Sequence, residues 1–262
     1  MRIRRLGWAG IEVEADGASL VVDLLRDPSE IEPFVGPPRG PLPAPAGQAA
    51  SAALVTHLHV DHCDPVAVAA ALAPDGVVLR PDVMVGGGLE TAALAAAEAG
   101  LAEVRLDTRE MAPWASTVVG PFTVTALPAV DGFGDTQVSW AIEAGGHRIL
   151  HAGDTIFHGA WWLARMRCGP FDAVFLPVNG PLVDLPHRQP PSPLPAAMDA
   201  EQAAAAAAIL EAGLAVPVHY DTINGPPRYV QGDQPAARFA AACATAGVPC
   251  RVMETGETLE LD

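Results

Sequence analysis

Three histidines and an aspartate occur within six consecutive residues, at His57, His59, Asp61 and His62. They directly follow the apolar stretch 52–55, which predicts a buried strand. Alternate side chains of an extended segment share one side, so His57 and His59 are expected to point the same way, while a turn brings Asp61 and His62 to a neighbouring position. A loop of solvated histidines is the alternative, but residues of this kind at this density have no packing rationale. The run therefore predicts a loop that serves two metal ions.

Two further predicted strand ends carry residues that could bind a metal. Asp154 follows Gly153 after the predicted strand 148–150, and a carboxylate buried there is costly unless it is paired or metal-bound. His219 ends the apolar segment 216–218. A single histidine in such a place is usually structural, but three strand ends of this kind together indicate one metal centre.

The order of these motifs resembles the metallo-β-lactamase superfamily: His-x-His-x-Asp-His, then Gly-Asp after a strand, then a late histidine at a strand end. Within it, the chain is most similar to the ascorbate-6-phosphate lactonase-like group of metal-dependent hydrolases, along nearly its whole length. The similar stretches are residues 6–10, 151–155, 176–180, 198–203 and 217–220. The resemblance implies a four-layer αβ/βα sandwich of the α/β (α+β) class, with the metals at the shared edge of two sheets.

The resemblance also implies a role for each residue of the centre. The first metal would be held by His57 and His59, the second by Asp61, His62 and His219, and Asp154 would bridge the two. One position departs from the pattern, because the histidine that the group supplies after a segment like 127–129 is absent, and we align Asp131 with it. A carboxylate suits manganese or iron better than zinc. We therefore expect two divalent ions, zinc or manganese with iron as the alternative, and a first site that is weaker, differently populated or empty.

The chemistry expected of such a centre is hydrolysis. Two divalent ions roughly 3.5–4 Å apart make water a nucleophile near neutral pH and polarise a carbonyl or phosphoryl oxygen. Asp61 or Asp154 is predicted to accept or relay the proton of that water. His158, four residues after Asp154, is predicted to donate a proton to the leaving group, with a role at a helix start as the alternative.

Residues outside the motifs could contact the substrate. The proline-rich loop 181–195 carries His187 and Arg188, which could meet an anionic group or could simply be solvated. Tyr220 and Asn179 lie just past predicted strand ends and are candidates for lining the pocket.

Composition narrows the class of protein. A chain of 262 residues with 50% apolar residues fits a single globular domain over residues 1–262. Fifteen basic residues, all of them arginine, face 31 acidic ones, and the formal net charge of −16 disfavours binding to nucleic acid. The expected partner is a small-molecule substrate, and the sequence favours no particular oligomeric state.

Cysteine usage and the apolar segments indicate the compartment. The four cysteines show no spacing typical of a disulfide framework or a zinc knuckle, which favours a reducing interior. The first residues lack the apolar core of a signal peptide, and no stretch of about 18 apolar residues follows. We therefore expect a cytoplasmic protein with no membrane association.

Strand and helix patterns alternate along the chain, so two mixed sheets flanked by helices are expected. A β-meander is predicted at the start, with Asp16-Gly17 as a hairpin turn. Helices are predicted at 66–73 (begun by Asp64 and Pro65), 89–99, 161–166, 199–212 and 235–246. Later strands are predicted at 77–80, around 104, and at 118–127, 138–142, 148–150, 173–178, 214–218, 251–253 and 258–261.

Four functions remain open at this point. The first is hydrolysis of a small ester, lactone or amide, with or without a phosphate group, and the second is phosphodiester hydrolysis. The third is redox chemistry at a single iron, which the departure at Asp131 favours. The fourth is a catalytically silent ligand-binding protein. The pair His57 and His59 argues against it, because a protein without a working site has no reason to keep two buried histidines, which are costly to bury.

Overall fold

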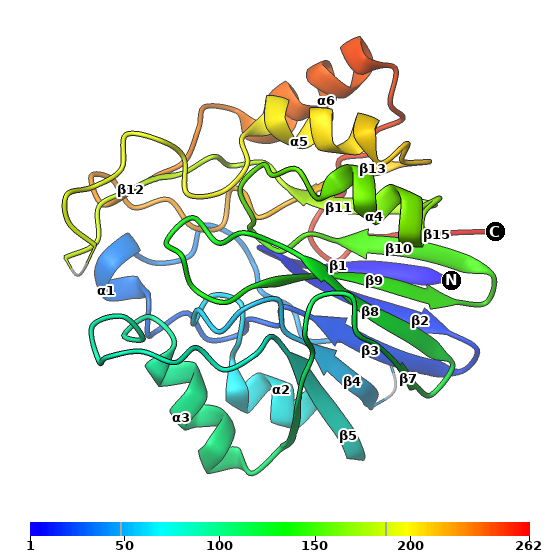
Figure 1. Ribbon diagram of the computed structural model, residues 1–262, viewed down its shortest axis with the longest axis horizontal. Helices are drawn as coiled ribbons and strands as arrows, with labels where there is room; N and C mark the ends of the chain where they lie inside the picture. Colours follow the sequence, from blue (N-terminus) through cyan, green and yellow to red (C-terminus); the bar gives the residue numbers. More distant parts are fainter. Residues whose placement is uncertain (48, 187) are drawn as a thin grey trace.

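Two facing β-sheets form the interior of the computed structural model, which describes residues 1–47, 49–186 and 188–262 (Figure 1). The predicted role of His187 therefore lies outside the described residues. The first sheet has the order β15-β1-β2-β3-β4-β5-β6, with β1 Arg2–Gly7, β2 Gly10–Ala15, β3 Ala18–Val22, β4 Ala50–Leu54, β5 Leu72–Arg80, β6 Asp107–Glu110 and β15 Thr258–Glu260. The second has the order β13-β11-β10-β9-β8-β7, with β7 Ser116–Val119, β8 Phe122–Pro128, β9 Val138–Ala144, β10 His147–His151, β11 Ala173–Pro177 and β13 Ala215–Val218. A small ribbon pairs β12 (Leu182–Val183) with β14 (Tyr229–Val230).

Alternation along the strands divides the apolar side chains between two cores. In β3, Leu20 and Val22 join the core between the sheets, whereas Val21 packs on the outer side. In β11, Phe175 faces the first sheet while Val174 faces the outer helices. Both faces of each sheet are therefore buried, which requires a further layer of structure outside each one.

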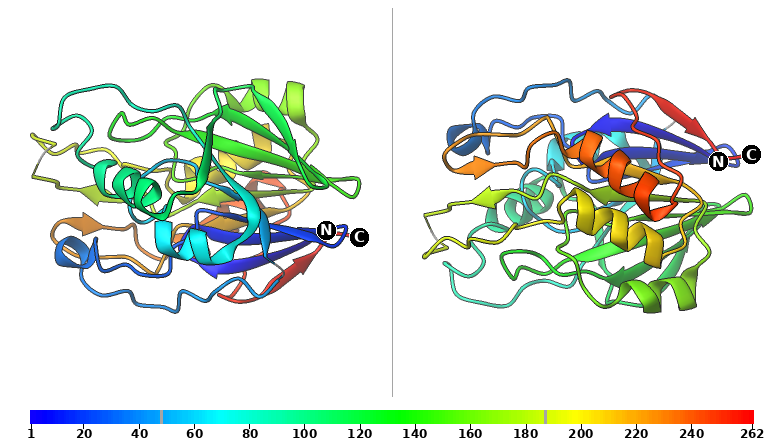
Figure 2. Two further views of the ribbon diagram at one scale, coloured as in Figure 1. Left: turned by 90° about the horizontal axis from the view of Figure 1, so that it is seen from below. Right: turned by 90° about the horizontal axis from the view of Figure 1, so that it is seen from above.

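Helices supply these outer layers (Figures 1 and 2). The first sheet is covered by α2 (Pro65–Ala71) and α3 (Ala95–Val104), and the second by α4 (Trp161–Cys168), α5 (Ala200–Ile209) and α6 (Pro235–Ala246). The predicted four-layer αβ/βα sandwich is confirmed. No helix of the described residues is both long enough and apolar enough to span a bilayer.

Local signals set most element boundaries. Asp16 and Gly17 both have positive φ, as a two-residue hairpin turn requires, and Ala15 pairs with Ala18 across it. Asp64 caps α2 by accepting from the backbone N of Ala67 at 2.9 Å. The predicted meander and the predicted start of α2 are thus confirmed.

Tertiary contacts explain where the sequence prediction was wrong. The helix expected at 89–99 is α3, displaced to Ala95–Val104, so the strand expected around residue 104 is absent and β6 follows instead. Gly100 lies inside α3 because a Cβ there would be 2.6 Å from Pro65 of α2, so the two helices pack too closely for a larger residue. Residues 251–253 form no strand, and the short helix α1 (Glu32–Val35) lies where the sequence analysis predicts neither a helix nor a strand.

The topology gathers certain strand ends at one edge. In the first sheet β3 and β4 are parallel, and in the second β10, β11 and β13 are parallel. Parallel neighbours present their carboxyl ends at the same edge, where α/β folds place ligands. In Figure 1 this edge is on the side of α1 and β12, away from both termini.

Candidate metal centre

The loops that follow these strands carry the side chains of the candidate site. They place Asp23 after β3, His57 after β4, Asp131 after β8, Asp154 after β10 and His219 after β13. Contributions from both sheets therefore meet at their shared edge.

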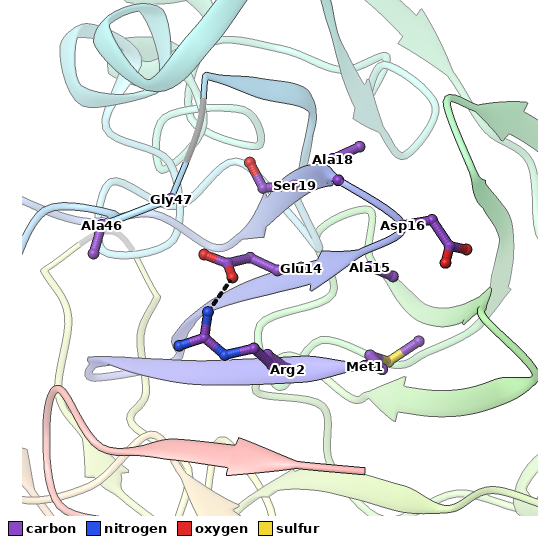
Figure 3. Close-up of a pocket in the computed structure, with 10 residues that line it drawn as sticks. Met1, Arg2, Glu14, Ala15, Asp16, Ala18, Ser19, Ala46 and Gly47 are labelled. Carbon is purple, nitrogen blue, oxygen red and sulfur yellow. Dashed lines mark hydrogen bonds and ion pairs between the residues drawn. The ribbon is translucent and has the colours of Figure 1, made fainter. Parts of the chain in front are cut away.

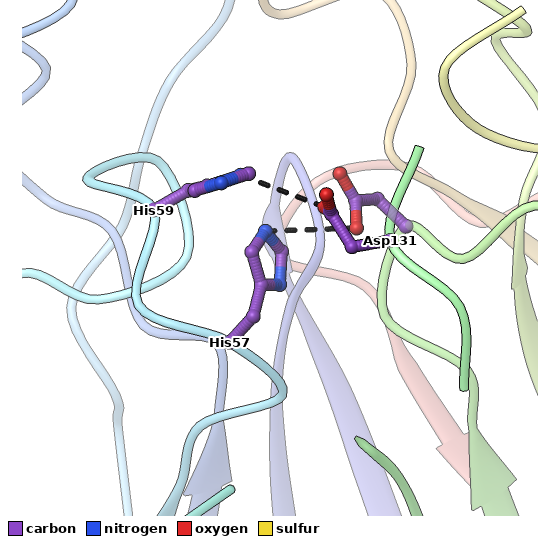
Figure 4. A group of neighbouring side chains, drawn as sticks. His57, His59 and Asp131 are labelled. Carbon is purple, nitrogen blue, oxygen red and sulfur yellow. Dashed lines mark ion pairs between the residues drawn. The ribbon is translucent and has the colours of Figure 1, made fainter. Parts of the chain in front are cut away.

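The first cluster consists of His57, His59, Asp131 and Asp154, whose ligand-type atoms all lie within 4.8 Å of one another. Figure 4 shows His57 and His59, on the loop after β4, facing Asp131 on the loop after β8. Nδ1 of His59 is 3.9 Å from Oδ2 of Asp131, and Nε2 of His57 is 3.6 Å from Oδ1 of Asp154. Asp131 thus lies in the same cluster as the two histidines, as the sequence alignment expects.

The second cluster consists of Asp61, His62 and His219, again with ligand-type atoms within 4.8 Å of one another. Oδ2 of Asp61 is 3.5 Å from Nε2 of His62 and 3.8 Å from Nε2 of His219. The indole N–H of Trp8 donates to the same oxygen at 3.0 Å. Trp8 therefore fixes the carboxylate of Asp61 toward the two imidazoles.

Asp154 lies between the clusters and turns one oxygen to each. Its Oδ1 faces His57, whereas its Oδ2 is 3.8 Å from Nε2 of His62 and 3.9 Å from Nε2 of His219. Gly153 permits this placement, because it has a φ of +70° and a Cβ there would lie 2.8 Å from Oγ1 of Thr56. Gly153 thus allows a close approach of the backbone to Thr56 that a residue with a Cβ would prevent.

Unpaired buried atoms show what the clusters could hold. Nε2 of His57, His62 and His219 and Oδ2 of Asp131 are buried without a hydrogen-bond partner. Leaving such atoms unpaired is costly, and nitrogen and carboxylate oxygen atoms are the donors that divalent zinc, manganese and iron accept. The two His/Asp clusters therefore fit a binuclear metal site.

Hydrogen bonds on the far side of the rings orient these atoms. Nδ1 of His62 is 2.8 Å from Oδ2 of the buried Asp23, and Nδ1 of His219 is 3.0 Å from Oδ1 of Asn179. Such bonds fix the tautomer that leaves Nε2 free for a metal. Asn179, predicted from the sequence as a pocket residue, instead holds a ring of the second cluster.

The first cluster is oriented by residues that the sequence analysis missed. Nε2 of His59 is 2.8 Å from Oδ2 of Asp135, which leaves Nδ1 directed at the cluster. Gln137 donates to Oδ1 of Asp154 at 2.6 Å. Asp135 and Gln137 follow Asp131 closely in the chain. The sequence offers one feature from which they could be predicted, a run of polar residues before the apolar strand 138–142.

An excess of carboxylates dominates the electrostatics of the site. Burial alone would lower the pKa of His59 and of His62. For His59, the hydrogen bond to Asp135 and the charge of Asp131 outweigh the effect of burial and raise the pKa to about 9. For His62, the charges of Asp61 and Asp23 outweigh it and raise the pKa to about 10. Burial raises the pKa of the Asp131 carboxyl to about 6. The site thus attracts positive charge, which protons or divalent cations can supply.

A cavity of about 440 Å³ opens onto both clusters. Its floor contains His59, Asp61, Asp154 and His219. Its walls come from α1, the start of α3 and the loop after β11. A cavity of this size accommodates a small-molecule substrate directly over the candidate metal centre.

A second hollow lies at the opposite end of β3, around the Asp16-Gly17 turn (Figure 3). It contains the ion pair between Arg2 and Glu14, at 2.7 Å, on the surface of the first sheet. None of the residues of the two clusters lines it. The cavity over the clusters is therefore the better candidate site.

Two candidates from the sequence lie elsewhere. His158 stacks on Trp161, with ring centroids 4.2 Å apart, and accepts from the backbone N of Ala160, so it has the contacts of a residue at a helix start. It lines neither cluster nor cavity, and its position gives no support to a role as proton donor. Tyr220 is turned away to Arg5, which donates to its hydroxyl at 2.8 Å, and Tyr229 lines the cavity instead.

Arg188 is engaged by the protein itself. Its guanidinium donates to the backbone oxygens of Leu89 and Glu90, both at 3.1 Å, and to Oδ1 of Asp135 at 3.0 Å. These contacts occupy Nη1 and Nη2 and leave Nε buried without a partner, so they give no support to the expectation that Arg188 meets an anionic group on a substrate. Arg188 instead fixes the carboxylate that orients His59.

Comparison with known protein families shows the superfamily to which the chain belongs. The family model described as beta-lactamase superfamily domain matches residues 23–220, which include both clusters. The chain belongs to this superfamily. Its sandwich is the metallo-β-lactamase fold. The narrower lactonase-like group is not decided by this match.

Three similar proteins were found along the whole chain. A protein of Aeropyrum pernix described as a UPF0173 metal-dependent hydrolase is 26% identical over 273 residues, covering 100% of this chain and 98% of its own. Igni18, a metallo hydrolase of Ignicoccus hospitalis, has a TM-score of 0.68 at 19% identity, covering 100% of this chain and 99% of its own. CmlA, a diiron β-hydroxylase from Streptomyces venezuelae, has a TM-score of 0.76 at 18% identity. The comparison with CmlA covers 99% of this chain but only 54% of CmlA, so this chain spans about half of that protein.

The placement of Asp154 by Gly153 can be tested directly. Gly153→Ala is expected to push the Cβ against Thr56 and Gln137 and to displace Asp154, so the protein should bind less metal. Gly146→Ala is the matched control, because Gly146 also has positive φ, +81°, but nothing lies within 4 Å of its Cβ position. Both variants should lose about 1 kcal/mol of stability from the backbone strain. Equal metal content in the two variants, measured by mass spectrometry of the elements, would show that the close approach does not position Asp154.

Proposed function

We propose that this protein is a metal-dependent hydrolase that acts on a small ester, lactone or amide. The observation that carries the proposal is the pair of clusters joined by Asp154, with unpaired nitrogen and oxygen atoms directed inward beneath an open cavity. The curated relative and Igni18 are both described as hydrolases, which supports the same class of reaction. The narrower lactonase-like grouping is part of the proposal and is supported by the motif order alone.

The clusters would hold two divalent ions, with His57, His59, Asp131 and Asp154 at the first and Asp61, His62, His219 and Asp154 at the second. Two such ions polarise a carbonyl oxygen and lower the pKa of a bound water enough to make it a nucleophile near neutral pH. Asp61 and Asp154 border the cavity, so their carboxylates can accept or relay the proton of the attacking water.

Tyr229 is placed to assist at the carbonyl. It lines the cavity, and Nδ2 of Asn179 donates to its hydroxyl oxygen at 2.9 Å, which leaves the phenol proton to be donated elsewhere. Burial and the charge of Asp61 keep the pKa of Tyr229 well above its ordinary value, so the phenol holds its proton at neutral pH. We assign it as a hydrogen-bond donor toward the substrate oxygen that gains charge.

Redox chemistry at iron is the second candidate. Asp131 stands where the resemblance expects a histidine, and a first cluster with two imidazoles and two carboxylates suits iron or manganese more than zinc. CmlA, which has the same fold, is described as a diiron β-hydroxylase. Phosphodiester hydrolysis and a silent binding role have no comparable observation in their favour.

Metal content and turnover test the main proposal together. Protein purified without chelators is expected to bind two divalent ions per chain and to hydrolyse members of a panel of esters, lactones and amides. Asp154→Ala should abolish turnover and lower the metal content, because it removes the carboxylate shared by the clusters, while circular dichroism shows an intact fold. His219→Ala should lose the second ion. His147→Ala is the control, because His147 lies at the start of β10, outside both clusters, and should change neither readout. Full activity in the Asp154→Ala variant would show that the two clusters are not the catalytic metal centre.

Tyr229→Phe tests the hydrogen-bond donor. Loss of one donor to a developing oxyanion typically lowers kcat about 10²-fold, so we expect such a loss with little change in KM or metal content. Tyr220→Phe is the matched control, because the hydroxyl of Tyr220 faces Arg5 rather than the cavity. A kcat that Tyr229→Phe leaves at the native value would remove Tyr229 from the mechanism.

Asp131→His separates the two candidate functions. The substitution should shift the preference of the first cluster from iron and manganese toward zinc, as measured by metal content after dialysis against an equimolar mixture. A hydrolase should keep its activity with zinc in this variant. Native protein that binds iron and consumes oxygen in the presence of a reductant, and a variant that loses that consumption, would favour redox chemistry instead.

A further inference from the structure

We infer that the cavity selects substrates whose non-reacting part is uncharged and apolar. The inference rests on the proposed function, because it assumes that the reacting bond lies at the two clusters. It concerns the walls of the cavity above them, which nothing in the metal centre itself determines.

The walls are apolar and come from three separate segments. Phe34 of α1, Ala93 before α3, Val183 of β12 and Leu185 after it surround the opening, with Phe133 beside the first cluster. These side chains offer no hydrogen-bonding group, so the part of a ligand that contacts them gains free energy by leaving water only if it is apolar.

Among the described residues, the lining includes no arginine and no lysine. Arg188 lies nearby but does not line the cavity: its Nη1 and Nη2 donate to Leu89, Glu90 and Asp135, and its Nε is buried without a partner. Arg228 is exposed and does not line the cavity, and its guanidinium carbon is 5.9 Å from the ring centroid of Phe34. The charged residues among the described lining are those of the metal centre, Asp135 and Glu30. Glu30, which lies outside the centre, is an acid.

A remote phosphate or carboxylate would therefore be disfavoured. It would give up its hydration between apolar walls, find no arginine among the described lining residues to pair with, and approach Glu30 in a chain whose net charge is −16. An alkyl or aryl group of the same size would meet no such penalty. The walls thus favour a neutral acyl ester or amide and oppose the phosphorylated substrates that the sequence analysis left open.

Paired esters measure this selection. The metal-loaded protein is expected to hydrolyse 4-nitrophenyl hexanoate with a kcat/KM at least tenfold above that of mono-4-nitrophenyl adipate, which has the same chain length and a terminal carboxylate. To remove any difference in intrinsic reactivity, the ratio of kcat/KM values is divided by the ratio of the rates at which imidazole hydrolyses the two esters. Non-productive binding of the carboxylate to the metals does not alter kcat/KM. Equal corrected values would overturn the inference.

A cation placed in the wall should change the preference. Val183→Arg is expected to reduce the hexanoate preference to near unity or reverse it, because the guanidinium can pair with the adipate carboxylate. Leu194→Arg adds the same charge on the same loop, but Leu194 is 69% exposed and lies outside the lining, so the preference should persist. If Val183→Arg folds poorly, Leu185→Arg serves the same purpose. Equal shifts in the wall variant and in Leu194→Arg would overturn the inference.

Binding without turnover distinguishes this inference from the proposed function. In ligand-detected NMR, 1-hexanol should bind the metal-loaded protein at least tenfold more tightly than hexane-1-sulfonate, a weak metal ligand of the same chain length. Neither molecule contains a bond for the enzyme to hydrolyse. If neither ester turns over but hexanol is preferred, the proposed hydrolysis fails and the selection stands. Equal affinity for the two overturns the selection.

Discussion

The concentration of buried carboxylates at one sheet edge is the constraint on which the rest of the structure depends. Asp23, Asp61, Asp131, Asp135 and Asp154 are all buried there. Carboxylates so placed repel one another and lose their hydration, so the fold is tenable only if cationic partners offset both effects. Arg188 and the imidazoles supply part of that charge, and the inward nitrogens that lack partners leave room for divalent ions to supply more.

The sandwich meets this constraint by giving each sheet a share of the ligands. Strands β3 and β4 of the first sheet and β10, β11 and β13 of the second end at the same edge, and each is followed by a polar side chain of the site. Because both faces of each sheet are packed, the strand ends cannot shift independently. The geometry of the centre is therefore fixed by the same cores that hold the layers together.

The sequence predicted the parts of the site that are dense or follow an apolar strand. The run from His57 to His62, the Gly-Asp pair and His219 stand out because such residues are rare next to buried segments. Asp23 and Tyr229 were missed, because an aspartate after a strand is common and Tyr229 belongs to no motif, and only the fold brings them to the site. His158 has the contacts of the alternative role, at a helix start, because a short distance in sequence from Asp154 does not place it at the same edge.

The same distinction holds for the fold. Alternation and capping signals predicted the meander and α2, since both depend on neighbours in the chain. The displacement of α3 depends on the contact of Gly100 with Pro65, and sequence patterns treat a glycine as the end of a helix. The family match over residues 23–220 is in accord with the motif order, whereas the choice among its chemistries depends on the walls and on Asp131.

Arg188 joins three parts of the molecule that are distant in sequence. Through one guanidinium, the loop after β11 is tied to the backbone at Leu89 and Glu90 and to the carboxylate that orients His59. Any widening of the entrance that separates these segments must also loosen the imidazole beneath. With an ion held by the first cluster, a ligand that separates these segments would therefore weaken the contact of His59 with that ion.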